Sequence, residues 1–346
     1  MDKVRTAVIG LQFGRTHAVH IKNGTARGGE LAAVVDLNEG HKDLADSWGV
    51  PFFANYREML EKIKPQGVFI ATPPATHLPI GIDCMEAGAH IYVEKPVAVT
   101  SEEADELIAA EKRLGKKIQV GQHHRFEPTV TMAKEKIASG EMGRLIGFNI
   151  LGTLPKSEGY FSQEYRIKRS GGGGVVSING IHDVDRIRYL CGEVDRVFAI
   201  KGNSIRGFKE VEDTAGVSIM CKNGAVGTYF ISDSAHPLSE YTDTYFLEKG
   251  TIRFKCSSFY RQPGFHVYQE GFLGEDDKGR GLGDRTRDIK THHIPFQIPH
   301  ARAAEFFCSM IRDNLEPRSS AADGKKSMEL MNALIESMDS GNVVYL

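Results

Sequence analysis

The first 120 residues alternate short, mostly apolar runs with stretches of helical periodicity. The apolar runs lie at residues 5–9, 31–35, 67–71, 90–93 and 118–120, and the helix-compatible stretches at 16–22, 77–87 and 101–114. Apolar runs of this kind are typical of strands buried on both faces of a parallel sheet. The alternation therefore predicts an α/β fold with a Rossmann-type, doubly wound parallel sheet.

The pattern changes after Gly121. A helix is predicted at 128–139, helices follow at 301–312 and 325–337, strand or hairpin patterns occur at 145–153, 194–202, 214–230 and 243–256, and 274–283 reads as a loop. These strands suit a large mixed, mostly antiparallel sheet. Since 346 residues suffice for two cores, we expect a first domain of residues 1–121 and an α+β domain of residues 122–346. The C-terminal helix is free to pack back on the first domain.

The turn between the first strand and helix carries the first candidate chemistry. It contains Gly10, Gln12, Phe13 and Gly14, and glycine there lets a pyrophosphate approach the helix N-terminus. The turn is one residue shorter than G-x-G-x-x-G and has Gln12 in place of the middle glycine, so alone it also fits an ordinary strand–helix turn.

Asp36 ends the next strand and strengthens the dinucleotide prediction. Its carboxylate stands where a Rossmann domain recognises ribose hydroxyls, and no arginine follows it in Asp36-Leu37-Asn38. A carboxylate there repels a 2′-phosphate, so we expect NAD in preference to NADP.

Composition narrows the possible partners. The formal net charge is −2, so the chain has no excess of positive charge that would attract nucleic acid or an anionic membrane. No signal-type apolar segment occurs, which favours a cytoplasmic location. The five scattered cysteines form no C-x-x-C pair, and the histidines show no H-x-x-x-H spacing. We therefore expect reduced thiols and no metal.

Glu94-Lys95-Pro96 follows the strand at 90–93 and places a carboxylate and a cation where open α/β sheets bind ligands. With this tripeptide the sequence resembles the glucose–fructose oxidoreductase, inositol dehydrogenase and rhizopine-catabolism (Gfo/Idh/MocA) family of NAD(P)-dependent oxidoreductases. Further segments carry the resemblance: 71–77, 87–96, 120–126, 137–143, and Gly172-Gly173-Gly174 followed by His182 and Asp185.

The resemblance implies roles for individual residues. It implies a Rossmann domain followed by a substrate-binding and oligomerisation domain, and hence a homodimer or homotetramer formed through the C-terminal sheet. Cofactor contact is implied for Thr72, Pro73, His77, Glu94 and Lys95, with a cis bond at Pro96. The candidate substrate-binding residues are His123, Arg125, Tyr165, Arg166 and Asp185.

His182 is the candidate base and Lys95 the group that holds the developing alkoxide, because oxidation of a secondary alcohol must remove both a hydride and a proton. The family's dehydrogenases carry an aspartate four residues before the histidine, where this chain has Ile178. Three possibilities stay open: Asp183 or Asp185 supports His182, His182 acts with Lys95 alone, or the chemistry has changed.

Three functions are compatible with the sequence. The leading one is a hydride-transferring dehydrogenase of a ring hydroxyl on a small, nearly neutral sugar or cyclitol, since the candidate residues offer mostly hydrogen-bond donors. The second is a glycoside hydrolase that uses NAD for transient oxidation. The third is a non-catalytic, NAD-linked sensor.

Overall fold

The computed structural model describes residues 2–203, 207, 210–236, 239–255, 264–269, 288–293 and 297–346. Contacts within the chain divide it into two compact units, one of Met1–Phe126 with Ile298–Met328 and one of Glu127–Gln297 with Glu329–Leu346. The division at residues 121 and 122 stays a prediction. The loop expected at 274–283 and Cys256 lie outside the described residues.

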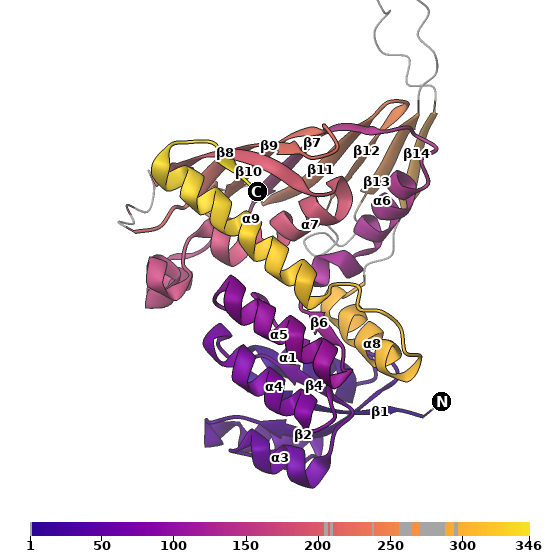
Figure 1. Ribbon diagram of the computed structural model, residues 1–346, viewed down its shortest axis with the longest axis vertical. Coiled ribbons are helices and arrows are strands. Elements are labelled where there is room, and N and C mark those ends of the chain that lie inside the picture. Colours follow the sequence, from indigo (N-terminus) through magenta and orange to yellow (C-terminus); the bar gives the residue numbers. More distant parts are fainter. Residues whose placement is uncertain are drawn as a thin grey trace, which may run out of the picture. The chain divides into compact units, whose positions relative to one another are not determined.

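The first unit contains a parallel sheet of six strands in the order β3-β2-β1-β4-β5-β6 (Figure 1). The strands are β1 (Val4–Ile9), β2 (Gly29–Val35), β3 (Phe52–Phe53), β4 (Gly67–Ile70), β5 (His90–Val93) and β6 (Ile118–Val120). The helices are α1 (Leu11–Lys22), α2 (Lys42–Trp48), α3 (Tyr56–Ile63), α4 (His77–Glu86), α5 (Ser101–Leu114) and α8 (Pro299–Arg312). This strand order is that of the dinucleotide-binding Rossmann fold, which confirms the predicted fold of this half.

Successive strand residues face the two helix layers in turn. Val8, Val34 and Phe69 pack with the apolar residues of α1, α2 and α8, whereas Ala7 and Val35 pack with those of α3, α4 and α5. A strand buried on both faces must be apolar at nearly every position, and this explains the continuous runs in the sequence.

The second unit contains a mixed sheet of nine strands among the described residues, in the order β14-β13-β12-β11-β7-β10-β9-β8-β15. The strands are β7 (Leu145–Thr153), β8 (Val194–Gly202), β9 (Thr214–Cys221), β10 (Val226–Ser232), β11 (Glu240–Leu247), β12 (Gly250–Lys255), β13 (Gly264–Gln269), β14 (Asp288–His293) and β15 (Val344–Tyr345). β7 and β10 are parallel, and the other neighbours are antiparallel. The predicted mixed, mostly antiparallel sheet is confirmed.

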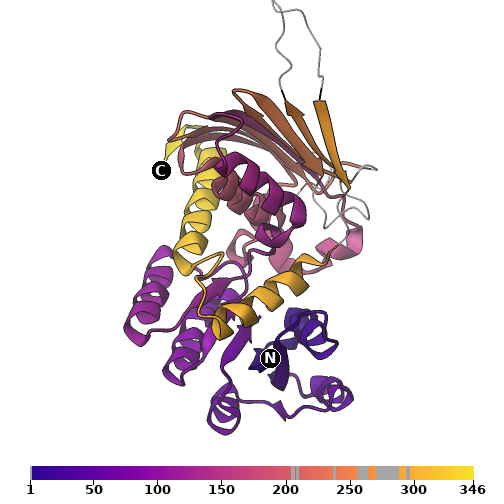
Figure 2. The same ribbon diagram turned by 90° about the vertical axis from the view of Figure 1, so that its right-hand side faces the viewer.

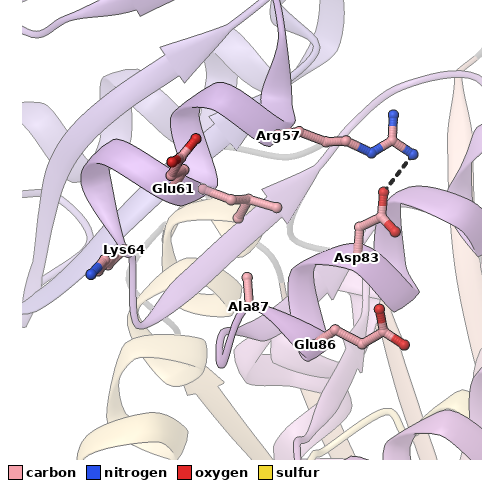
Figure 3. A pocket seen from close by; sticks show the side chains of 7 residues that line it. Arg57, Glu61, Lys64, Asp83, Glu86 and Ala87 are labelled. Atoms are coloured by element: carbon pink, nitrogen blue, oxygen red, sulfur yellow. Dashed lines mark ion pairs between the residues drawn. The ribbon is translucent and has the colours of Figure 1, made fainter.

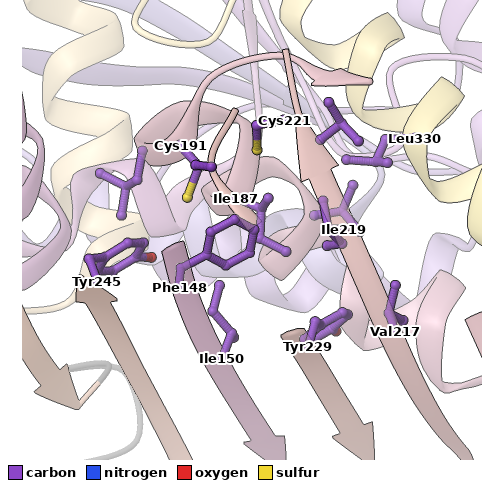
Figure 4. Packing of buried hydrophobic residues seen from close by; sticks show 14 of the residues in the cluster. Phe148, Ile150, Ile187, Cys191, Val217, Ile219, Cys221, Tyr229, Tyr245 and Leu330 are labelled. Atoms are coloured by element: carbon purple, nitrogen blue, oxygen red, sulfur yellow. The ribbon is translucent and has the colours of Figure 1, made fainter. Parts of the chain in front are cut away.

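Helices cover one face of this sheet (Figure 2). They are α6 (Pro128–Ala138), α7 (Ile181–Cys191) and the part of α9 (Ala321–Ser340) that belongs to this unit. Figure 4 shows Ile187 and Leu330 of two of these helices beside the strand residues Phe148, Val217 and Tyr245. The opposite face presents Phe198, Ile200, Val226, Phe230 and Phe246, which are 40–61% exposed.

A buried charged network fastens α7 to the sheet. Arg186 donates two hydrogen bonds to Asp243 on β11, at 2.6 and 2.9 Å, and a third to Asp183, at 2.9 Å. Tyr229 on β10 donates to Asp183 at 2.8 Å, and Tyr245 donates to Asp243 at 2.7 Å. The three charged side chains are fully buried, so each depends on the others for its charge compensation.

Four of the cysteines lie in the described part of the chain, and all four are free thiols. They are Cys84, Cys191, Cys221 and Cys308. A search of the described residues finds no helix with the length and apolar character needed to cross a membrane.

Asp243→Ala should lower the free energy of unfolding by roughly 3–5 kcal/mol, because it leaves the buried Arg186 guanidinium short of a partner. Urea unfolding followed by circular dichroism measures the change. The matched control is Arg144→Ala, which removes the exposed ion pair with Glu248 and should cost about 0–1 kcal/mol. Equal losses in both variants would contradict the importance of the network.

Candidate active site

The predicted phosphate-binding turn has the geometry that only glycine allows. Gly10 follows β1 with φ of +87°, and a Cβ there would lie 2.7 Å from the carbonyl oxygen of Ala71. A Cβ on Gly14 would lie 2.7 Å from a methyl group of Val8. The two glycines therefore let α1 begin directly against the sheet, with Gln12 and Phe13 exposed on its first turn. The helix N-terminus is the element that binds a pyrophosphate in such folds.

Asp36 lies at the end of β2 and is held in its ionised form. One carboxylate oxygen accepts a hydrogen bond from the Leu11 amide at 2.6 Å, and the other accepts from the Asn38 amide at 2.8 Å. Burial alone would raise the pKa of Asp36, but these bonds and the neighbouring His41 outweigh it and keep the pKa below its usual range. A fixed carboxylate at this point suits recognition of ribose hydroxyls.

His41 was not identified from the sequence. Its Nδ1 lies 3.2 Å from Asp36 Oδ2, five residues further along the chain. No motif marks a histidine at that spacing.

The strand-end residues gather at one edge because β4 and β5 are neighbours in a parallel sheet. Thr72 and Pro73 follow β4, and Glu94 and Lys95 follow β5. The bond between Lys95 and Pro96 is cis, as the family resemblance implied.

Glu94 is bound by a histidine of α1. Its Oε1 lies 2.7 Å from Nε2 of His17, which is fully buried on α1. Burial would raise the pKa of Glu94, but the hydrogen bond and charge of His17, together with His300 and Lys95, hold the pKa below its usual value. The sequence offered a signal for His17 that was missed: it lies on the buried helix face with Leu11, Gly14, Ala18 and Ile21.

Lys95 is next to this carboxylate. Burial lowers the pKa of Lys95, and Glu94 partly opposes the shift. A lysine whose proton is released more readily than usual suits a group that exchanges or shares a proton.

His300 also lies near Glu94 and Lys95, and it was not identified from the sequence. The His300 ring stacks on His123 with 3.8 Å between the ring centroids, and it also contacts Phe13. Burial lowers the pKa of His300 to about 4. His300 is thus neutral near neutral pH and supplies ring packing.

His77 and Arg125, both predicted to touch ligand, hold neighbouring chain segments. The His77 ring nitrogens lie 3.0 Å from the carbonyl oxygen of Pro96 and 2.9 Å from that of Thr72. Arg125 is buried, donates to the Arg318 carbonyl at 2.8 Å and lies 3.3 Å from Asp323. His77 thus joins the ends of β4 and β5, and Arg125 joins the segment after β6 to the start of α9; ligand contact by either residue stays a prediction.

In the second unit, His182 and Asp185 are buried on α7. Asp183 belongs to the Arg186 network, with its two oxygens 2.9 and 2.8 Å from Arg186 and Tyr229. Burial raises the pKa of Asp183 to about 6, and Arg186 and Tyr229 oppose the shift. The network thus accounts for both oxygens of Asp183, and this weakens the possibility that Asp183 supports His182.

Tyr165 and Arg166 do lie together. The Arg166 Nε donates to the Tyr165 hydroxyl at 3.0 Å, and the guanidinium carbon lies 3.6 Å from the ring centroid of Tyr160. Tyr160 was missed from the sequence, as were Lys156, whose Nζ lies 4.9 Å from the same centroid, and Asn179.

A hollow on the first unit is separate from all these residues. It lies between α3 and α4, where Arg57 and Asp83 form an ion pair of 2.7 Å (Figure 3). None of the predicted site residues lines it, so we assign it no part in the candidate site.

His17→Leu should weaken NADH binding and shift its loss at acid pH to higher pH. The buried Glu94 carboxylate would lose the partner that lowers its pKa, so it would take up a proton at a higher pH. Fluorescence titration of NADH across pH measures both effects. His20→Leu, on the same helix, is the control and should leave the pH dependence unchanged. A uniform loss of affinity at every pH would reduce His17 to a packing role.

Comparisons with known proteins agree with this arrangement. Residues 4–122 match the family model described as the oxidoreductase family, NAD-binding Rossmann fold, and residues 130–253 match the GFO/IDH/MocA C-terminal domain. A solved structure of levoglucosan dehydrogenase in complex with NADH and levoglucosan has a TM-score of 0.83 at 24% identity, covering 99% of both chains. At that identity the likeness concerns the fold alone.

Two curated proteins from Bacillus subtilis (strain 168) are similar in sequence. The uncharacterized oxidoreductase YrbE is 31% identical over 232 residues, which are 65% of each chain. The scyllo-inositol 2-dehydrogenase (NAD(+)) is 34% identical over 194 residues, 55% of this chain and 54% of that protein. Each match thus spans less than two-thirds of the relative. Both halves of the chain nevertheless match domains of one family: the chain belongs to the Gfo/Idh/MocA oxidoreductase family, with its NAD-binding Rossmann domain and its C-terminal domain.

Proposed function

We propose that the protein transfers a hydride between NAD and a ring hydroxyl of a sugar or cyclitol. The proposal rests on the position of Lys95. It follows β5 at the carboxyl end of the parallel sheet, next to the Glu94 carboxylate that is hydrogen-bonded to His17. Ligands of open α/β sheets bind at this edge. A scyllo-inositol 2-dehydrogenase among the relatives and a levoglucosan dehydrogenase of the same fold support the substrate class.

The cofactor, when bound, supplies the hydride acceptor. The protein's own part is to manage the proton and the charge on the substrate oxygen. The Lys95 ammonium stabilises the negative charge that develops on that oxygen, and its lowered pKa makes it ready to exchange a proton. His182 takes the hydroxyl proton as general base. Glu94, fixed by His17, balances the charge of Lys95.

Of the possibilities left open for His182, we favour action with Lys95 alone. Ile178 carries no charge, and Asp183 is committed to Arg186 and Tyr229.

NAD is the proposed cofactor in preference to NADP. The ionised Asp36 carboxylate would repel a 2′-phosphate, and it has two backbone donors that keep it in place. The NADH in the levoglucosan dehydrogenase structure agrees with this choice.

Purified protein should reduce NAD, and NADP more slowly, with at least one member of a panel of sugars and cyclitols, as followed by nicotinamide absorbance. Lys95→Met should lower the rate by about 10²–10⁴-fold, the usual contribution of such a group. Lys112→Met, an exposed lysine on α5, is the control.

Other outcomes separate the competing functions. Release of aglycone from an aryl glycoside without net NADH would indicate the hydrolase. NADH binding without turnover of any substrate, unaffected by Lys95→Met, would indicate the sensor.

We also propose that the protein forms a homo-oligomer through the uncovered face of the second unit's sheet. Five large apolar side chains of that face are 40–61% exposed: Phe198, Ile200, Val226, Phe230 and Phe246. Exposed apolar groups gathered on one face are typical of interfaces between proteins. A second copy of this chain is the partner we propose, because the same apolar face on two copies can pack together about a two-fold axis.

Phe230→Asp should dissociate this oligomer, because two copies of the charge would be buried at the interface. Analytical ultracentrifugation measures the change in mass. Lys222→Glu, in the exposed turn between β9 and β10, is the control and should leave the mass unchanged. A monomeric parent protein would refute the proposal.

A further inference from the structure

Arg166 lies in the segment between β7 and α7. The two cations that follow it in this segment, Lys168 and Arg169, both have acidic partners. Lys168 lies 3.0 Å from Glu210, and Arg169 lies 3.7 Å from Glu212 and 3.6 Å from Asp339. Arg166, in contrast, pairs with no carboxylate in the described part of the chain. Its contacts are the Tyr165 hydroxyl and the faces of two tyrosine rings.

A second cation approaches the same ring. The Lys156 Nζ lies 4.9 Å from the Tyr160 ring centroid, and the Arg166 guanidinium carbon lies 3.6 Å from it. Burial lowers the pKa of Lys156, Asp233 opposes this shift, and the positive charge of Arg166 adds to it. Two cations thus repel each other across one aromatic ring, with Asp233 as the compensating charge.

Neutral donors complete the cluster. The Asn179 amide lies by the Tyr160 hydroxyl, and its nitrogen is buried without a hydrogen-bond partner of good geometry. Burial raises the pKa of Tyr160, which therefore keeps its proton at neutral pH. A buried donor that lacks an acceptor costs free energy, and a ligand oxygen can supply that acceptor.

We propose that Lys156, Tyr160, Arg166 and Asn179 bind an anionic group of the substrate, a carboxylate or a phosphate. The guanidinium offers the paired donors that fit either oxyanion, Lys156 adds charge, and the Asn179 amide donates to a further oxygen. The substrate is then an acidic or phosphorylated sugar or cyclitol rather than a neutral polyol. This inference rests on the proposed dehydrogenase function and narrows its substrate class.

The test compares matched substrates: glucose, glucuronate and glucose 6-phosphate, with the corresponding galactose and mannose series. We measure kcat/KM with NAD, and binding to the NADH-loaded protein by calorimetry. In at least one series the uronate or the phosphate should exceed the neutral sugar by about 10- to 100-fold, as expected for a charge-assisted pair. The two anionic members distinguish a carboxylate site from a phosphate site.

Arg166→Gln should bring the ratio of anionic to neutral substrate close to one. Arg166→Lys, which keeps the charge but loses the paired donors, should give an intermediate ratio. Lys168→Gln is the control because that cation already has Glu210 as its partner, and it should preserve the ratio. Thermal melts verify that each variant is folded.

The possible failures can be told apart. Arg166-dependent binding of an anionic sugar without turnover would support the site and refute the dehydrogenase. Equal use of neutral and anionic members, or an equal loss for both in Arg166→Gln, would overturn the anionic site and leave the dehydrogenase standing. No preference for an anionic member in either binding or turnover would also overturn the inference.

Discussion

The paired hydrogen bonds between Arg186 and Asp243 are the interaction on which the second unit most depends. A fully buried guanidinium is tolerated only when carboxylates and well-placed acceptors surround it, and here the acceptors come from α7 itself and from β11. Hydrophobic packing tolerates other apolar residues of similar volume, whereas a two-pronged ion pair has strict geometry and adds to the fixed register of α7 on the sheet. His182 lies four residues before Arg186, and positions four apart share a helix face. The pair therefore also fixes where the candidate base stands in its unit.

The first unit uses the same principle at Glu94. A carboxylate removed from water requires a donor, and His17 provides it from α1, the helix that follows the predicted phosphate-binding turn. One hydrogen bond thus joins α1 to the strand end that carries Lys95. The turn before α1 also packs against Ala71 at the end of β4, so the proposed cofactor-binding turn and the proposed reacting lysine are held by the same group of contacts.

Much of the fold was predictable because its elements follow local rules. Strands buried on both faces are apolar throughout, so the strands of the Rossmann half could be predicted. The hairpin pattern at 214–230 likewise predicted β9 and β10 of the second half. Asp36 was predicted from its place at the end of the second strand, and Arg166 from the family resemblance. His17, His300 and Tyr160 were missed. The helix pattern showed that His17 is buried, but the partners of the two histidines are distant in sequence, such as Glu94 at 77 positions from His17, and Tyr160 lies in an irregular segment. Asp183 and Arg186 are three residues apart on one helix, but their partners Tyr229 and Asp243 are 46 and 57 positions away, so the network as a whole could not be predicted.

The loss of the family's aspartate at Ile178 and the surplus cation at Arg166 have a common electrostatic explanation. Ile178 is adjacent to Asn179, which belongs to the proposed anion-binding cluster. A carboxylate at position 178 would put a negative charge next to Asn179 in the chain, and a negative charge beside the cluster opposes an anion by like-charge repulsion. An uncharged residue removes that conflict. Asp233 already opposes the charge of Lys156, so the substrate's negative charge is needed to compensate Arg166, which pairs with no carboxylate among the described residues. A neutral sugar would leave the Arg166 guanidinium uncompensated, and discrimination against it would follow from the same desolvation cost that applies to Arg186 and Glu94.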